Sequence, residues 1–233
     1  MPLPEIVTPT YTLVVPSTKK KIKYRPFLVK EQKALIIALE TNDQEMIYDA
    51  IKGVLDSCIN TRNVNVDELA LFDIEYIFLQ IRARSISEQL ELKVTCPDDN
   101  ETEVLVKILV DDVGIDYPKG HKNIIDLGSE ITLEMKYPNL NYFSAVTFAK
   151  EDVDPYDLVA QCIKRVYVDK EDSGEFTFDE AREWVESLTN AQFGKVQEFF
   201  NTMPSLRHTF SVKNPKTQVE SEFTIEGLAD FFG

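Results

Sequence analysis

The chain has 233 residues, 43% of them apolar, and carries 25 Lys and Arg against 40 Asp and Glu, a formal net charge of −15. This length and apolar content allow a buried core without disulfides, which excludes general disorder, while the negative charge would repel nucleic acid and anionic membranes. Because no apolar run approaches the ~20 residues of a membrane span and the N-terminus lacks the order of a signal peptide, we expect a cytoplasmic protein.

The first 86 residues are predicted to form a β-hairpin followed by helices. Two short strands, joined by the turn Pro16-Ser17-Thr18-Lys19, are expected over residues 11–15 and 21–25. Helical spacing of apolar residues predicts three helices, over residues 28–39, 43–58 and 66–85. The last of these is apolar around most of its circumference, which indicates burial in the core or contact with a partner protein.

Residues 87–137 are predicted to be rich in β-structure, because apolar residues there alternate with polar ones. Three strands are expected, over residues 90–94, 104–110 and 131–137. Residues 111–128 carry three Gly and one Pro, so we expect a long loop there that marks the boundary between two lobes.

Residues 138–204 are predicted to be helical, and residues 205–233 to end the chain in a second hairpin. Three helix starts carry capping patterns, at Asp154-Pro155, Thr177 and Thr189. The first of these helices is expected to bury Cys162, Ile163 and Val166 on one stripe. An α+β fold is therefore predicted, in four segments: 1–86, 87–137, 138–204 and 205–233.

The tips of the two later hairpins share a pattern. The turns Cys96-Pro97-Asp98-Asp99 and Asn214-Pro215-Lys216-Thr217 have the form that grips zinc when Cys occupies their first and last positions. Only Cys96 fills such a position, and Cys58 and Cys162 fall on apolar stripes of helices, so we expect neither zinc nor a disulfide. The pattern still predicts that the hairpin of 205–233 packs on residues 87–110 in one β module, like a degenerate zinc ribbon.

A second metal pattern lies at residues 169–180, which have the layout of a calcium-binding loop between helices, with an acid first, Gly sixth and Glu last. The candidate ligands are Asp169, Glu171, Ser173, Glu175 and Glu180. Against calcium, Glu171 and Ser173 stand where Asp or Asn is usual, and no second loop is present to pair with this one. Glu180 is equally well explained as the partner of Thr177 in a capping box.

No catalytic constellation is recognisable in the sequence. The two histidines are His121, in the expected loop, and His208, in the apolar row of a strand, and neither has a Ser or Cys partner at a characteristic spacing. The 8 glycines form no phosphate-binding loop. We therefore expect a protein without a cofactor that is not an enzyme; a calcium-dependent or hydrolytic enzyme is the alternative.

Two segments resemble signature segments of the baseplate hub assembly proteins of T-even-type contractile-tailed phages. They are KIKYRPFLVKEQK at residues 21–33 and FDIEYIFLQIRARS at residues 72–85. Near the C-terminus, further stretches are similar to the same family, at Gln192-Phe193, Phe199-Phe200, Met203-Pro204 and Glu226-Gly227-Leu228. Some relatives carry complete Cys-x-x-Cys pairs at the two hairpin tips, so this chain would lack any zinc role of the family.

The resemblance implies a non-enzymatic role in assembling the central hub of the tail baseplate. The protein would act in the host cytoplasm as an assembly factor or chaperone for hub or tape-measure proteins, and an acidic surface would help to keep such partners soluble. The alternative is a permanent structural subunit of the hub, retained in the virion baseplate. The sequence leaves self-association open.

The first hairpin carries a basic cluster that stands out against the acidic background. Its members are Lys19, Lys20, Lys21, Lys23 and Arg25. We expect this cluster to bind a partner protein. The alternative is a charged edge strand that guards against aggregation.

Overall fold

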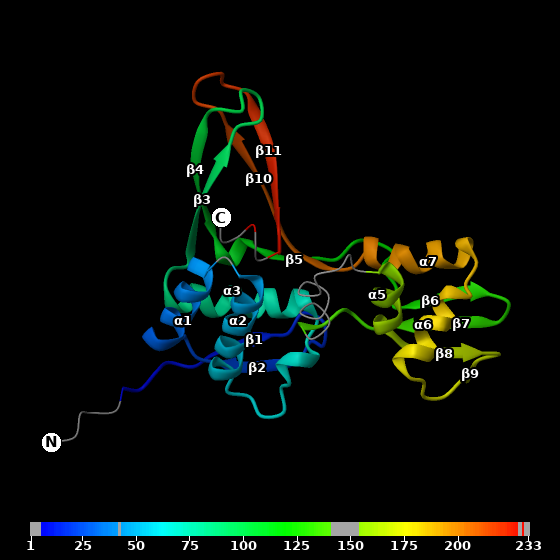
Figure 1. Cartoon of the computed structure of the whole chain (residues 1–233). Coiled ribbons are helices and arrows are strands. Elements are labelled where there is room, and N and C mark those ends of the chain that lie inside the picture. Colours follow the sequence, from blue (N-terminus) through cyan, green and yellow to red (C-terminus); the bar gives the residue numbers. More distant parts are fainter. Residues whose placement is uncertain (1–5, 42, 141–153, 228–229, 231–233) are drawn as a thin grey trace. The chain divides into compact units, whose positions relative to one another are not determined.

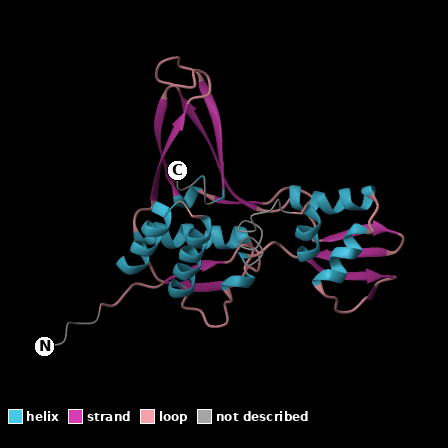
Figure 2. Ribbon diagram, in the orientation of Figure 1, coloured by secondary structure: helices cyan, strands magenta, loops and turns pink. Residues whose placement is uncertain are grey.

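The computed structural model describes residues 6–41, 43–140, 154–227 and 230 (Figure 1). It has an α+β fold, as the sequence predicts, built from helices and small antiparallel sheets (Figure 2). The chain divides into two compact units: unit 1 comprises residues 1–66, 72–116 and 205–233, and unit 2 comprises residues 67–71 and 117–204. The change from unit 1 to unit 2 after Asp116 falls inside the segment 111–128 that the sequence marks as a boundary.

Unit 1 begins with a β-hairpin, in which β1 (Tyr11–Val14) pairs antiparallel with β2 (Lys21–Tyr24). The helices that follow are α1 (Val29–Thr41), α2 (Gln44–Cys58) and α3 (Leu71–Ser85), and the short 3₁₀ helix η1 (Val66–Glu68) precedes α3 in the chain. Strand alternation buries Ile22 and Tyr24 of β2, because successive side chains point to opposite faces.

Helix α3 forms much of the core of unit 1. Eight of its fifteen residues are buried, and Ile77, Leu79 and Ile81 are completely enclosed. Core burial therefore explains why this helix is apolar all round, and the alternative of partner contact does not hold for it. The buried carboxylate of Asp73 accepts a hydrogen bond from the backbone N–H of Ser17 at 2.8 Å, which ties the turn of the first hairpin to α3.

Two further hairpins complete unit 1. β3 (Gln89–Thr95) pairs with β4 (Glu103–Leu109), and β10 (Ser205–Lys213) pairs with β11 (Glu220–Glu226). After the 3₁₀ helix η2 (Val110–Asp112), β5 (Gly114–Asp116) joins the free edge of β10. Both hairpins share one apolar cluster with α3, which includes Leu79, Leu90, Leu92, Ile108, Leu206 and Ile225. The two hairpins thus pack together through this cluster but form two separate sheets, and the likeness to a zinc ribbon stays a prediction.

Unit 2 contains a four-stranded antiparallel sheet in the order β6-β7-β8-β9. Its strands are β6 (Ile124–Gly128), β7 (Ile131–Met135), β8 (Ile163–Val168) and β9 (Glu171–Asp172). Its helices are α5 (Pro155–Cys162), α6 (Phe178–Glu186) and α7 (Asn190–Asn201). Their apolar faces meet the sheet in a second core cluster, which includes Leu133, Met135, Val159, Val185, Val196 and Phe199.

Two predictions about local structure are wrong. Residues 111–128 are not one loop, because β5 and β6 lie within them. Residues 138–204 are not simply helical either: α5 ends at Cys162, and Ile163 and Val166, expected on a helical stripe, belong to β8 instead. Residues 141–153 of this segment lie outside the described residues. Pairing of Val166 with Leu133 of β7 decides the outcome, because strand pairing outweighs a periodicity that fits either structure.

Candidate docking surfaces

Four of the five residues in the predicted basic cluster are exposed on the first hairpin. Lys19 and Lys20 follow its turn, and Lys21 and Lys23 occupy the exposed positions of β2. The structure therefore brings four lysines together on a chain whose net charge is −15.

Arg25 does not belong to this surface. Its side chain is only 15% exposed, and its guanidinium pairs with Glu31 at 3.1 Å and donates to the carbonyl of Pro26 at 2.9 Å. The hydrogen bond to Glu31 raises the pKa of Arg25 despite partial burial. Glu31 also accepts a hydrogen bond from the N–H of Leu28, so the pair fixes the start of α1. Arg25 is thus a structural residue, and its prediction as a docking residue is wrong.

The outer edge of β2 is hydrogen-bonded at its C-terminal end. Lys23 donates its N–H to Thr61 Oγ1 at 2.7 Å and accepts from the N–H of Asn60 at 2.8 Å, and Arg25 donates to the carbonyl of Cys58 at 2.9 Å. An edge strand needs guarding only where its backbone groups are unpaired. At Lys23 this edge therefore needs no guarding, and the lysines stay candidates for docking, with edge protection as the alternative at Lys21.

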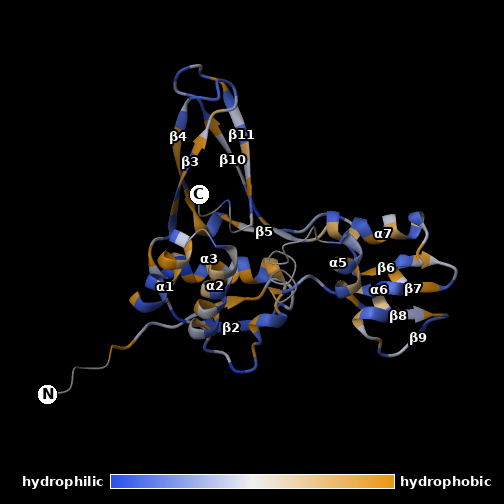
Figure 3. Ribbon diagram, viewed as in Figure 1, coloured by the Kyte–Doolittle hydropathy of each residue, from blue (hydrophilic) through white to orange (hydrophobic). Residues whose placement is uncertain are grey.

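A second exposed surface lies on α1. Only two of the thirteen residues of this helix are buried. Ile36, Ile37 and Leu39 are 47%, 45% and 46% exposed, and Val29 is 81% exposed. Hydrophobic residues, orange in Figure 3, thus reach the surface along this helix. These four residues are named the α1 apolar surface.

A sequence signal for this surface exists in the run Ala34-Leu35-Ile36-Ile37-Ala38-Leu39. Six consecutive apolar residues exceed one helical turn, so they place apolar groups on every side of the helix. Leu35, Ala38 and also the half-exposed Leu39 line a small apolar cavity with Ile51 of α2 and Phe78 of α3. The remaining side of α1 is consequently left exposed.

The tips of the β3–β4 and β10–β11 hairpins are joined by side-chain hydrogen bonds. Asp98 accepts from Asn214 Nδ2 at 3.0 and 3.1 Å with its two carboxylate oxygens, and also from the hydroxyl of Thr217. The bonds from Thr217 and Asn214 hold the pKa of Asp98 below its ordinary value. Asn214 and Thr217 occupy two of the would-be zinc positions, and both donate hydrogen bonds to the carboxylate of Asp98. Asp98, Asn214 and Thr217 are named the tip clasp.

Replacing Asn214 with alanine is expected to lower the free energy of unfolding of unit 1 by about 2 kcal/mol. The fully buried Asn214 side chain bonds Asp98 and also accepts from the N–H of Lys216 at 2.8 Å, and alanine makes neither interaction. Urea unfolding followed by far-UV circular dichroism measures the change. Lys216→Ala, an exposed substitution in the same turn, is the matched control, and equal stability of the two variants would contradict a role for the clasp.

The calcium-loop candidates do not lie in the predicted helix–loop–helix. Strand β8, not a helix, precedes the loop, and Asp169 and Lys170 form its hairpin turn to β9, each with a positive φ. Glu180 closes a capping box with Thr177. Within the described ranges, no group of three or more His, Cys, Asp or Glu is placed to hold a metal ion.

Other reactive side chains have structural surroundings. Burial raises the pKa of the Cys58 thiol to about 11 and that of Cys162 to about 12, so both stay protonated at neutral pH. Both are core residues, as predicted. The His208 ring contacts the carbonyl of Asp112 at 3.2 Å. The His121 ring lies between Tyr137 Oη and Thr202 Oγ1, at 3.0 Å from each, and connects the loop before β6 to the end of α7.

His121 should make unit 2 sensitive to mild acid. Burial lowers the pKa of His121 below the value of 6.5 for a free side chain, so the unfolded state takes up a proton first. The stabilisation is fully present above pH 6.5 and is lost as the pH falls through the lower folded-state pKa. The urea midpoint, followed by fluorescence of the single tryptophan, Trp184, should fall between pH 7.5 and 5.5. His121→Gln should show a smaller fall, and an equal fall in both proteins would refute the assignment.

Comparison with known proteins identifies the family. Among the residues that the structure describes, none of the helices has the length and apolar character needed to cross a membrane. No curated protein and no solved structure matches the chain. The family described as T4 bacteriophage base plate protein matches residues 8–233, from just before the first hairpin to the last residue. The chain therefore belongs to the T4 bacteriophage base plate protein family.

Proposed function

We propose that this baseplate protein is not an enzyme and that it acts by binding other baseplate proteins while the central hub is assembled. The observation that carries the proposal is the α1 apolar surface. Four large apolar side chains on one helix face solvent, and such exposure is costly unless another protein covers it. A partner that laid an apolar surface against α1 would bury Ile36, Ile37 and Leu39.

The basic cluster of Lys19, Lys20, Lys21 and Lys23 supplies a second contact in this proposal. Because the rest of the chain is acidic, these lysines would orient the molecule against an acidic partner and speed their encounter. The expected partners are other hub proteins and the tape-measure protein, met in the host cytoplasm. The negative charge of the chain supports a chaperone role, since mutual repulsion keeps complexes that hold apolar partners from aggregating.

Recovery of the chain from infected cells tests the proposal. A phage that encodes an affinity-tagged chain is used for infection, and complexes are purified while tails are being assembled. We expect hub proteins to co-purify with the wild-type chain and to be lost when Ile36 and Ile37 are changed to aspartate. Co-purification of the same proteins with both chains would contradict docking through α1.

A permanent structural subunit of the hub is the second candidate, and membership of the baseplate family favours it. The two roles share the same contacts but differ in the fate of the chain. Mass spectrometry of purified virions separates them: an assembly factor should be absent, and a structural subunit should be retained in a fixed ratio to other hub proteins. Turnover of any metabolite that a single substitution abolishes would contradict both roles.

A further inference from the structure

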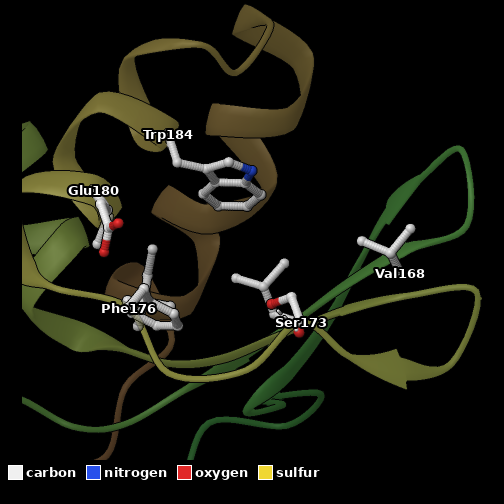
Figure 4. Close-up of a pocket in the computed structure, with 8 residues that line it drawn as sticks. Val168, Ser173, Phe176, Glu180 and Trp184 are labelled. Atoms are coloured by element: carbon white, nitrogen blue, oxygen red, sulfur yellow. Dashed lines mark hydrogen bonds between the residues drawn. The ribbon is translucent and has the colours of Figure 1, made fainter.

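Unit 2 contains an apolar pocket between α6 and the β8–β9 hairpin (Figure 4). Its volume is about 240 Å³, and its apolar walls come from Ile163, Val166, Val168, Phe176, Ala181 and Trp184. Figure 4 shows the side chains of Phe176 and Trp184 facing this space from the loop and from α6. Aromatic side chains around an apolar hollow are typical of sites that receive one anchoring side chain of another protein.

The polar side chains that line the pocket already form hydrogen bonds within the protein. Ser173 donates its hydroxyl to the carbonyl of Val166 at 2.8 Å, and Glu180 is engaged in the capping box with Thr177. Inside the pocket, contact with an incoming group is therefore chiefly apolar. The volume also lies below the ~300–1,000 Å³ of sites that enclose a cofactor or drug-sized molecule. A single aliphatic or aromatic side chain suits this size and lining better than a polar small molecule does.

The surroundings of the pocket are strongly acidic. Residues 169–186 contain eight Asp and Glu against one Lys and one Arg. The arginine, Arg182, pairs with Asp154, Asp157 and Glu186. Four of the exposed acids next to the lining residues form no ion pair within the described part of the chain: Glu171, Glu175, Asp179 and Glu183. An occupant that places positive charge at this rim is therefore favoured.

We propose that the pocket between α6 and the β8–β9 hairpin binds a segment of another protein in which a Leu, Met or Phe side chain is flanked by lysines or arginines. The apolar side chain fills the space between Trp184 and Val166, and the basic side chains lie against Glu171 and Glu175. Apolar fit and charge complementarity come from different residues, so each can be removed separately. This pocket is a different site from the α1 apolar surface, so the proposal goes beyond hub assembly through α1. It can be tested with the purified chain alone.

Fluorescence of Trp184 reports occupancy directly, because it is the only tryptophan in the chain and lies in the pocket wall. The probe is a capped synthetic peptide with one leucine between two lysines on each side, added to the full chain at low salt. We expect a saturable shift of the emission to shorter wavelength. A peptide of the same charge with alanine in place of leucine should bind at least about tenfold more weakly, since a buried leucine contributes ~1.5–3 kcal/mol.

Charge reversal tests the rim. Glu171→Lys with Glu175→Lys should weaken binding of the leucine peptide about tenfold. The matched control, Glu220→Lys with Glu222→Lys, makes the same change of net charge on exposed positions of β11 in unit 1 and should leave affinity within about twofold. Circular dichroism spectra that match the wild type exclude misfolding as the cause of weaker binding.

Three results would overturn the proposal. These are equal affinity for the leucine and alanine peptides, equal loss in the rim and control variants, and no saturable change up to about 1 mM peptide. A fourth result, a dimer in solution that the peptide dissociates, would replace the proposal by one in which a second copy of this chain occupies the pocket. Failure of the α1 substitutions to affect hub assembly would leave peptide binding unchanged, so the two proposals fail independently.

Discussion

Replacing Ile36 and Ile37 together with aspartate is expected to leave the chain folded and to stop assembly of the baseplate hub. Both side chains are almost half exposed in the isolated chain, so the free energy of unfolding should fall by only about 1 kcal/mol. In a complex that covers the α1 apolar surface, two carboxylates would be buried without partners, at several kcal/mol each. Affinity for the partner should therefore fall more than about a hundredfold.

Two measurements are needed, one of the stability of the variant and one of its effect on tail assembly. Thermal unfolding by circular dichroism should move by no more than about 4 °C. Cells infected with phage that encode the variant should yield few complete tails in electron micrographs. The matched control is Val219→Asp with Ile124→Asp, at apolar positions that are 46% and 61% exposed, in the β10–β11 turn and on β6. Normal tail yield from the α1 variant, or equal loss from the control, would show that this surface is not the docking site.

Local signals in the sequence predict those parts of the fold whose cause is local. The capping boxes at Thr177 and Thr189 are both present, with the side-chain and backbone bonds that define them. The turn residues at 16–19 correctly predict that the flanking segments pair as the first hairpin. Turn chemistry also predicts that two distant hairpins lie side by side, although it does not predict the bond between Asp98 and Asn214 at their tips.

Elements that depend on distant partners could not be predicted in the same way. β5 has only three residues and exists because it pairs with the edge of β10, which lies about ninety positions later in the chain. β8 carries apolar residues at spacings that fit a helix as well as a strand, and its pairing with β7 decides between them. Sequence periodicity contains no information about such pairing.

The candidate docking surfaces were predictable in part, for a similar reason. The charge of the sequence identifies the lysines of the first hairpin, but it wrongly adds Arg25 to them. Arg25 forms an ion pair with Glu31, and this pair depends on how the strand meets α1, which the sequence does not show. Residues 34–39 are six apolar residues in a row, so the sequence predicts that not all of them can lie on one buried face of α1. Only the packing of α2 and α3 shows that Ile36 and Ile37 are the exposed ones.

Asp73→Ala is expected to cause the largest loss of stability of any single substitution considered, about 3 kcal/mol of the ~5–15 kcal/mol typical of a domain. The carboxylate of Asp73 is completely buried in α3 and accepts from both the N–H and the hydroxyl of Ser17. Alanine would leave these two donors without their acceptor and a cavity beneath the turn. Asp73→Asn keeps one acceptor oxygen in place, so its loss should be roughly half as large.

Urea unfolding followed by far-UV circular dichroism gives the size of the effect, and hydrogen exchange locates it. Exchange should accelerate most in residues 11–24, because Asp73 holds the turn of that hairpin through Ser17. Asp49→Ala, an exposed acid on α2, removes the same charge from unit 1 and should change stability by less than about 0.5 kcal/mol. If Asp73→Ala were no less stable than Asp49→Ala, or if exchange in the hairpin were unchanged, this buried carboxylate would not be what anchors the first hairpin to the core.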